Sequence, residues 1–274
     1  MPRNITEIKT IVGALDGFNL DPEETLVAVD LDNTVEWPHL DLGGDAWYHC
    51  LLNEAAAHIL DEETRKAFVI AIYRSVQCYV RTQPVEPEIV PLIKALQDKG
   101  VFLLAVTARD ECLKEATVRQ LKDIGVKIPL IIHCDGGDKG HKLKEFMDKE
   151  FIGKGKKLPS HIVMFDDKEH HLICVADVVE SLGISFTGFR YAFLDEKVKQ
   201  FDMSKANGEL AYIKEWLPEL LLDTVDKLHL AETDPALTLS PTLMTRGFFA
   251  LEPSRQYALQ CLEISESDRT KTLS

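Results

Sequence analysis

Two aspartates stand at the end of an apolar segment near the amino terminus. The segment from Thr25 to Leu31 is rich in Val and Leu, and it contains Asp30, with Asp32 two residues further on. Side chains at i and i+2 of a strand point to the same side, so the two carboxylates would project together. Carboxylates serve as nucleophiles, as proton donors and as ligands of hard cations. Taken alone, the pattern is more often an ordinary turn after a strand.

Other apolar segments also end in polar side chains. Thr107 closes one of them, Asp166 and Asp167 follow another, and Lys139 comes shortly after a third. Taken singly, the threonine fits a helix cap, the lysine a solvated side chain and the acidic pair a turn. Ligands of open α/β sheets bind at the carboxyl ends of the strands, where these side chains would all lie. Together they therefore predict one site.

The elements that must position these residues follow from the hydrophobic pattern. Near-continuous apolar segments are typical of strands that are covered on both faces. Between them lie longer amphipathic segments, so the sequence predicts an α/β fold with a doubly wound parallel sheet and helices on both faces. The predicted strands are residues 25–31, 101–107, 128–134, 161–165 and 184–189.

A mainly helical pattern interrupts this alternation between the first and second strands. We expect residues 36–86 to form a small helical cap, with an α/β core made of residues 1–35 and 87–230. The alternative is a helical pair packed on the sheet edge. A last helix is expected within 209–230, and residues 231–274 are expected to be a loosely attached tail without a catalytic role.

Composition narrows the class of protein and its partners. The net charge of -14 argues against sequence-independent binding to nucleic acid, which depends on Lys and Arg. The six cysteines form no C-x-x-C pair, which is typical of reduced thiols. No segment reaches the 18 or so consecutive apolar residues of a membrane span, and no export signal is recognisable. We therefore expect a cytoplasmic protein without membrane or nucleic-acid partners; the alternative is a bacterial effector secreted through its Ser/Thr-rich terminus.

The ordered set of motifs resembles the haloacid dehalogenase-like hydrolase superfamily over residues 25–191. That superfamily has a strand ending in D-x-D-x-[TV], a strand ending in Ser or Thr, a lysine, and a strand ending in an acidic pair. Here they correspond to LVAVDLDNTV, VFLLAVTAR, Lys139 and HIVMFDD. The resemblance implies a Rossmannoid fold, in which a lid between the first two motifs recurs. Because the dehalogenases of the superfamily lack the second aspartate, Asp32 favours phosphoryl transfer.

The resemblance also implies roles for the motif residues. Asp30 would be the nucleophile that forms an aspartyl-phosphate, and Asp32 would be the general acid and base. Thr107 and Lys139 would bind the phosphoryl oxygens. Mg²⁺ would be held by Asp30, by the main-chain carbonyl of Asp32, and by Asp167 or Asp166.

Some assignments stay open at this level. Lys142 lies one helical turn after Lys139 and could replace it, although helix amino termini favour the earlier residue. Arg109 either contacts the substrate or pairs with a surface acid. His170 and His171 are expected to begin a helix, because no convergent set of metal-binding histidines or cysteines accompanies them.

The expected function is Mg²⁺-dependent hydrolysis of phosphomonoesters, with a small phosphorylated molecule or a phosphoprotein as the substrate. One alternative is transfer of the phosphoryl group to an acceptor other than water. Another is a catalytically silent fold of this class that acts as a binding or effector module.

Overall fold

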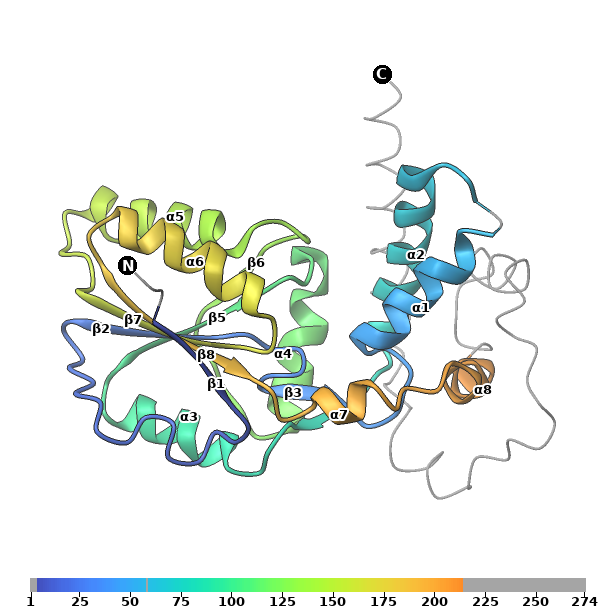
Figure 1. Cartoon of the computed structure of the whole chain (residues 1–274), viewed down its shortest axis with the longest axis horizontal. Helices are drawn as coiled ribbons and strands as arrows, with labels where there is room; N and C mark the ends of the chain where they lie inside the picture. The colour runs from blue at the N-terminus through green and yellow to red at the C-terminus, as the bar shows by residue number, and fades with distance from the viewer. Residues whose placement is uncertain (1–3, 58, 214–274) are drawn as a thin grey trace. The chain divides into compact units, whose positions relative to one another are not determined.

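The core of the protein is a sheet of six parallel strands, and Figure 1 shows how the elements are arranged around it. In the computed structural model, residues 4–57 and 59–213 are described. The strand order is β1-β8-β7-β2-β5-β6, and every pairing in this sheet is parallel. The strands are β1 (Ile5–Ile8), β2 (Thr25–Val29), β5 (Phe102–Thr107), β6 (Ile131–His133), β7 (His161–Asp166) and β8 (Ser185–Tyr191). The predicted α/β class with a doubly wound parallel sheet is confirmed.

Helices cover both faces of this sheet. Figure 1 shows α5 (Lys139–Glu150) and α6 (Glu169–Ser181) over one face and α3 (Ile89–Asp98) against the other. An apolar cluster lies on each face of the sheet, and alternate residues of β2 belong to each: Leu26 and Ala28 pack with α5 and α6, whereas Val27 and Val29 pack with α3. Burial on both sides explains why this strand reads as an unbroken apolar run.

The structure adds strands that the hydrophobic pattern did not indicate. β1 pairs with β8 at one edge of the sheet, and its sequence, ITEI, is too short and too polar to stand out. At the other edge, β6 covers only part of the predicted strand 128–134. Two short strands, β3 (Glu36–Pro38) and β4 (Thr82–Pro84), form a separate two-stranded sheet.

The chain divides into two compact units. The first consists of the described residues up to Trp37 together with Gln83–Lys114 and Leu121–Glu196, and it contains the six-stranded sheet. The second consists of Pro38–Thr82, Glu115–Gln120 and the described residues from Lys197 onward. The insertion in this unit runs from Pro38 to Thr82, and its boundaries fall within β3 and β4.

The second unit takes in more of the chain than the insertion alone. It holds α1 (Asp45–Ala55), α2 (Glu62–Gln77) and α8 (Met203–Ile213), and α4 (Lys114–Asp123) and α7 (Asp195–Val198) each cross a boundary between the units. The expected core ran to residue 230, whereas the structure groups the described residues after 196 with the insertion. The tail expected at 231–274, and most of the helix expected within 209–230, lie outside the described residues.

Two polar contacts explain why α8 belongs with the insertion. The Glu209 carboxylate accepts a hydrogen bond from the buried main-chain N–H of Leu42 at 2.8 Å. Lys205 pairs with Asp41 at 3.0 Å. Both contacts join residues more than 160 positions apart, so no local pattern in the sequence predicts them.

A close approach of α5 and α6 generates a first prediction. A Cβ atom on Gly140 would lie 2.3 Å from the carbonyl oxygen of Cys174, which is main chain and cannot rotate away. We expect Gly140→Ala to lower the free energy of unfolding by about 1–3 kcal/mol, because the helices must separate to admit the methyl group. Urea unfolding followed by circular dichroism measures this change.

The matched control is Gly44→Ala, where the nearest atom would lie at 3.6 Å and the backbone φ is -84°. Equal unfolding midpoints for the two variants would contradict the packing argument.

Candidate active site

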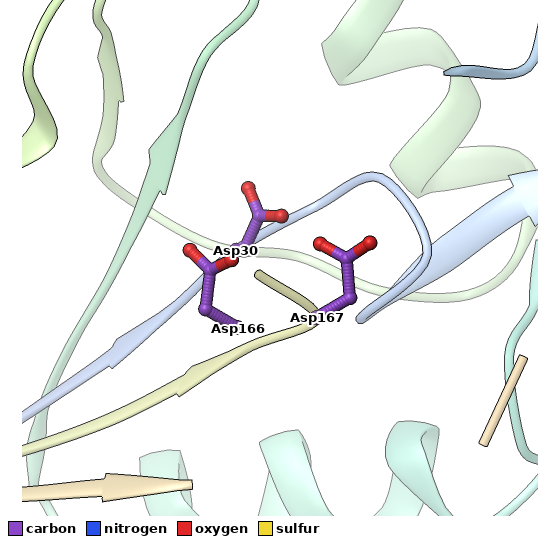
Figure 2. A group of neighbouring side chains, drawn as sticks. All are labelled: Asp30, Asp166 and Asp167. Atoms are coloured by element: carbon purple, nitrogen blue, oxygen red, sulfur yellow. The ribbon is translucent and has the colours of Figure 1, made fainter. Parts of the chain in front are cut away.

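Three carboxylates gather at the carboxyl ends of β2 and β7. Asp30 directly follows β2, and its main-chain N–H donates to the carbonyl of Phe165 at 2.9 Å. Asp166 is the last residue of β7, and Asp167 follows it. One oxygen from each of Asp30, Asp166 and Asp167 lies within 4.8 Å of the others. Figure 2 shows the three side chains as neighbours. The sheet thus brings together three of the acids singled out in the sequence.

Lys139 enters this group from α5. Its ammonium lies 2.6 Å from Oδ1 of Asp30 and 2.8 Å from Oδ2 of Asp166, and its side chain is 0% exposed. It is the first residue of α5, whose N-cap, Asp138, accepts a hydrogen bond from the main-chain N–H of His141 at 2.7 Å. The cap fixes the start of the helix, and so the direction of the lysine.

Lys142, the alternative lysine, does not reach the acids. Its side chain is 36% exposed and pairs with Glu145 of the same helix at 3.5 Å. Of the two lysines, Lys139 is therefore the one in contact with the gathered acids.

Burial and charge set the protonation of this group. Burial raises the pKa of Asp30 to about 6, against the opposing effect of Lys139 and with a further rise from the neighbouring acids. For Asp166, burial also acts upward, but Lys139 and His171 outweigh it and hold the pKa below its usual value. Burial disfavours the charged form of Lys139, yet Asp30 and Asp166 raise its pKa above the usual range. Lys139 is therefore a permanent cation.

Asp166 is surrounded by donors from the protein itself. Besides Lys139, its carboxylate accepts from the main-chain N–H of Lys168 at 2.9 Å, and Nδ1 of His171 lies 3.1 Å from the same oxygen. The two histidines begin α6 as expected, but the contact of His171 with a motif residue was not foreseen. Asp166 thus anchors Lys139 and the start of α6.

Asp167 is held differently, by the loop after β2. Its Oδ2 accepts from the side-chain amide of Asn33 at 3.3 Å, and its main-chain N–H donates to Oγ1 of Thr34 at 3.1 Å. Asn33 adopts a left-handed backbone (φ 60°), which asparagine tolerates better than most residues. Of the two adjacent acids Asp166 and Asp167, Asp167 is the more exposed.

Asp32 departs from the expected arrangement. β2 ends at Val29, so the alternation of a strand does not extend to Asp32, and its carboxylate is not one of the three gathered acids. Instead, Nε and one terminal nitrogen of Arg109 donate to its two oxygens at 2.8 and 2.7 Å. Arg109 is buried, with a side chain 3% exposed, and therefore does not pair with an acid on an open surface.

Thr107 ends β5 and is fully buried at the same edge of the sheet. Its hydroxyl oxygen accepts a hydrogen bond from the main-chain N–H of Arg109 at 3.2 Å. This position agrees with a role at the phosphoryl group, and that role stays a prediction.

The donors fit a hard divalent cation. Carboxylate oxygens are the ligands that Mg²⁺ prefers, and one ammonium does not balance three gathered carboxylates. Asp30 and Asp167 are the better pair, because the oxygens of Asp166 already accept from Lys139, Lys168 and His171. Within residues 4–57 and 59–213, Asp30, Asp166 and Asp167 are the acids, histidines or cysteines that lie close enough together to hold a metal ion.

The fold and the site define a doubly wound α/β protein with an acidic cluster at the carboxyl ends of its strands. The chain belongs to the DUF2608 family, a family of proteins of unknown function whose model matches residues 4–129 and 131–220. It is also 24% identical over 208 residues to a Chlamydia pneumoniae protein named "Putative outer membrane protein", an alignment that covers 68% of this chain and 76% of that protein. In the part of the chain that the structure describes, no helix has both the length and the apolarity to cross a membrane.

The buried lysine gives a prediction for stability. At pH 8, Lys139→Met leaves the Asp30 and Asp166 carboxylates buried without their cation, and we expect the free energy of unfolding to fall by about 3–5 kcal/mol. Removal of the cation raises the pKa of both acids, so they become neutral as the pH is lowered toward 5, and the deficit should shrink. Urea unfolding at several pH values measures it.

Lys142→Met is the control, since an exposed pair contributes about 0–1 kcal/mol. A Lys139→Met deficit that stays constant from pH 8 to pH 5 would show that the lysine acts through packing alone.

Proposed function

We propose that this chain is a Mg²⁺-dependent phosphohydrolase of the haloacid dehalogenase-like kind, which cleaves phosphomonoesters through an aspartyl-phosphate on Asp30. The observation that carries the proposal is the buried ammonium of Lys139, held between Asp30 and Asp166 at strand ends where Asp167 also lies. A permanent cation in contact with a carboxylate is suited to receive the charge of a phosphoryl group beside that carboxylate.

The first step is attack by an Asp30 oxygen on phosphorus. A bond forms between that oxygen and phosphorus as the ester P–O bond breaks, and the leaving oxygen takes a proton from Asp32. Lys139 already contacts Asp30 and would bind a phosphoryl oxygen without a change of position. The hydroxyl of Thr107 would bind another at the adjacent strand end.

The second step releases phosphate. Water attacks the phosphorus of the aspartyl-phosphate, Asp32 accepts a proton from that water, and the bond between phosphorus and the Asp30 oxygen breaks. The enzyme is then in its starting state. Each step transfers one proton at Asp32, so one residue serves as acid and then as base.

Asp30 and Asp167 would hold Mg²⁺, with Asp166 behind them as the partner of Lys139. When bound, the ion offsets the repulsion between the acidic cluster and an incoming phosphate dianion. Asn33 and Thr34 contact Asp167 and keep it beside Asp30. A small phosphorylated molecule or a phosphoprotein is the proposed substrate class.

Turnover should depend on the cation. We expect hydrolysis of p-nitrophenyl phosphate to stop after complete chelation and to return with added Mg²⁺. Asp167→Asn should raise the Mg²⁺ concentration that gives half-maximal rate by at least about tenfold, because it removes a charged ligand. Release of p-nitrophenol measures both effects, and undiminished turnover of the chelated protein would exclude this mechanism.

Asp30→Asn and Asp32→Asn should have different effects on formation of the phosphoenzyme. In Asp32→Asn the nucleophile remains, so a substrate with a good leaving group should still phosphorylate Asp30, and dephosphorylation should lag without the base. Asp30→Asn should form no adduct. Intact-protein mass after an acid quench measures the phosphoryl group, and an adduct on Asp30→Asn that maps to another residue would overturn the assignment.

A further inference from the structure

Arg109 is a buried cation of the site to which the proposed mechanism gives no step. It follows β5 by two residues, and its guanidinium lies between two carboxylates. One is Asp32, bound by two parallel hydrogen bonds, and the other is Glu36, which is fully buried and 3.2 Å away. A side chain that is costly to bury and is matched this closely to two acids needs an explanation.

The contact with Asp32 fixes direction as well as charge. Two parallel N–H···O bonds from one planar guanidinium to both carboxylate oxygens leave the acid one orientation relative to the arginine. Each carboxylate oxygen has a second lone pair, so Asp32 keeps the capacity to face a leaving oxygen while Arg109 holds it. The side chain of Asp32 is 21% exposed, so it is accessible from outside in this position.

The contact with Glu36 ties Arg109 to the rest of the loop. The loop after β2 folds back on itself: the carbonyl of Leu31 accepts from the N–H groups of Val35 and Glu36 at 2.9 and 3.0 Å, and Asn33 donates to the carbonyl of Glu36 at 2.9 Å. Arg109 therefore binds a loop that its own main-chain hydrogen bonds already close. Without the arginine, two carboxylates in this small loop would repel each other.

The same segment also holds Thr107. The main-chain N–H of Arg109 donates to the Thr107 hydroxyl oxygen, so the group proposed to bind the phosphoryl oxygens and the group that holds Asp32 lie in one turn. A shift of one would displace the other. The Thr107 hydroxyl and the Asp32 carboxylate are therefore both held by Arg109.

We infer that Arg109 is a positioning residue, which fixes the Asp32 carboxylate for proton transfer to the leaving oxygen and so lets the enzyme cleave esters with strongly basic leaving groups. The inference rests on the proposed function. A competing role is direct binding of the substrate phosphate by Arg109. The two roles differ in what they do to leaving groups, since phosphate binding is common to all substrates and protonation is not.

The test compares leaving groups across variants of the full chain. We expect Arg109→Gln to lower kcat/KM for an alkyl phosphate by about 100-fold or more, the scale of general acid catalysis, and to lower that for p-nitrophenyl phosphate far less. Arg109→Lys keeps the charge but not the two-point contact, so it should show the same selective loss in part. With p-nitrophenyl phosphate, Arg109→Gln should also accumulate the phosphoenzyme, as expected of Asp32→Asn.

Each outcome decides something. Equal losses on alkyl and p-nitrophenyl phosphates would overturn the inference in favour of phosphate binding, and so would full rescue of both rates by Arg109→Lys. If Arg109→Gln does not fold, the alkyl-to-aryl ratio of Arg109→Lys decides between the two roles. A parent protein with neither turnover nor adduct on any phosphate ester would overturn the proposed function itself, whereas turnover by the parent with equal losses in the variants would overturn only the role of Arg109.

Discussion

The contact of one buried ammonium with two carboxylates is the interaction on which the site depends. Lys139 joins the start of α5 to the ends of β2 and β7, which lie next to each other in the sheet. Each of the three charges would be costly to bury alone, and in this arrangement each has a partner of opposite charge. The cap at Asp138 and the missing side chain of Gly140 serve the same contact, because they fix where α5 begins and how closely it approaches α6.

The two aspartates of the first motif pair with different cations. Asp30 and Asp32 are chemically identical and two residues apart, yet Asp30 faces Lys139 and Asp32 faces Arg109. Their surroundings differ in burial as well, since Asp30 is nearly inaccessible and Asp32 is partly exposed. Different partners and different burial are what two carboxylates need if they are to perform different chemical tasks.

Much of this arrangement could be predicted from the sequence, for a physical reason. Strands covered on both faces leave unbroken apolar runs, and parallel strands end at one edge, so the gathering of Asp30, Asp166 and Thr107 follows from local patterns.

The pairing of Arg109 with Asp32 could not be predicted in this way, because it joins residues 77 positions apart that lie in loops. The choice of Lys139 over Lys142 likewise depended on which side of α5 faces the sheet. The polar strand β1 and the contact of α8 with Leu42 were missed because neither leaves a hydrophobic period.

The position of β2 in the sheet also governs the order in which the protein can form during synthesis. β2 is an interior strand, and both of its neighbours, β5 and β7, come later in the chain. The ribosome therefore releases Asp30 long before its partners exist, and Lys139 follows it by 109 residues. Until β7 emerges, the apolar strand β2 has at least one unpaired edge, and such an edge can pair with strands of other chains. Incomplete chains that end before His161 are thus the form of this protein most exposed to aggregation.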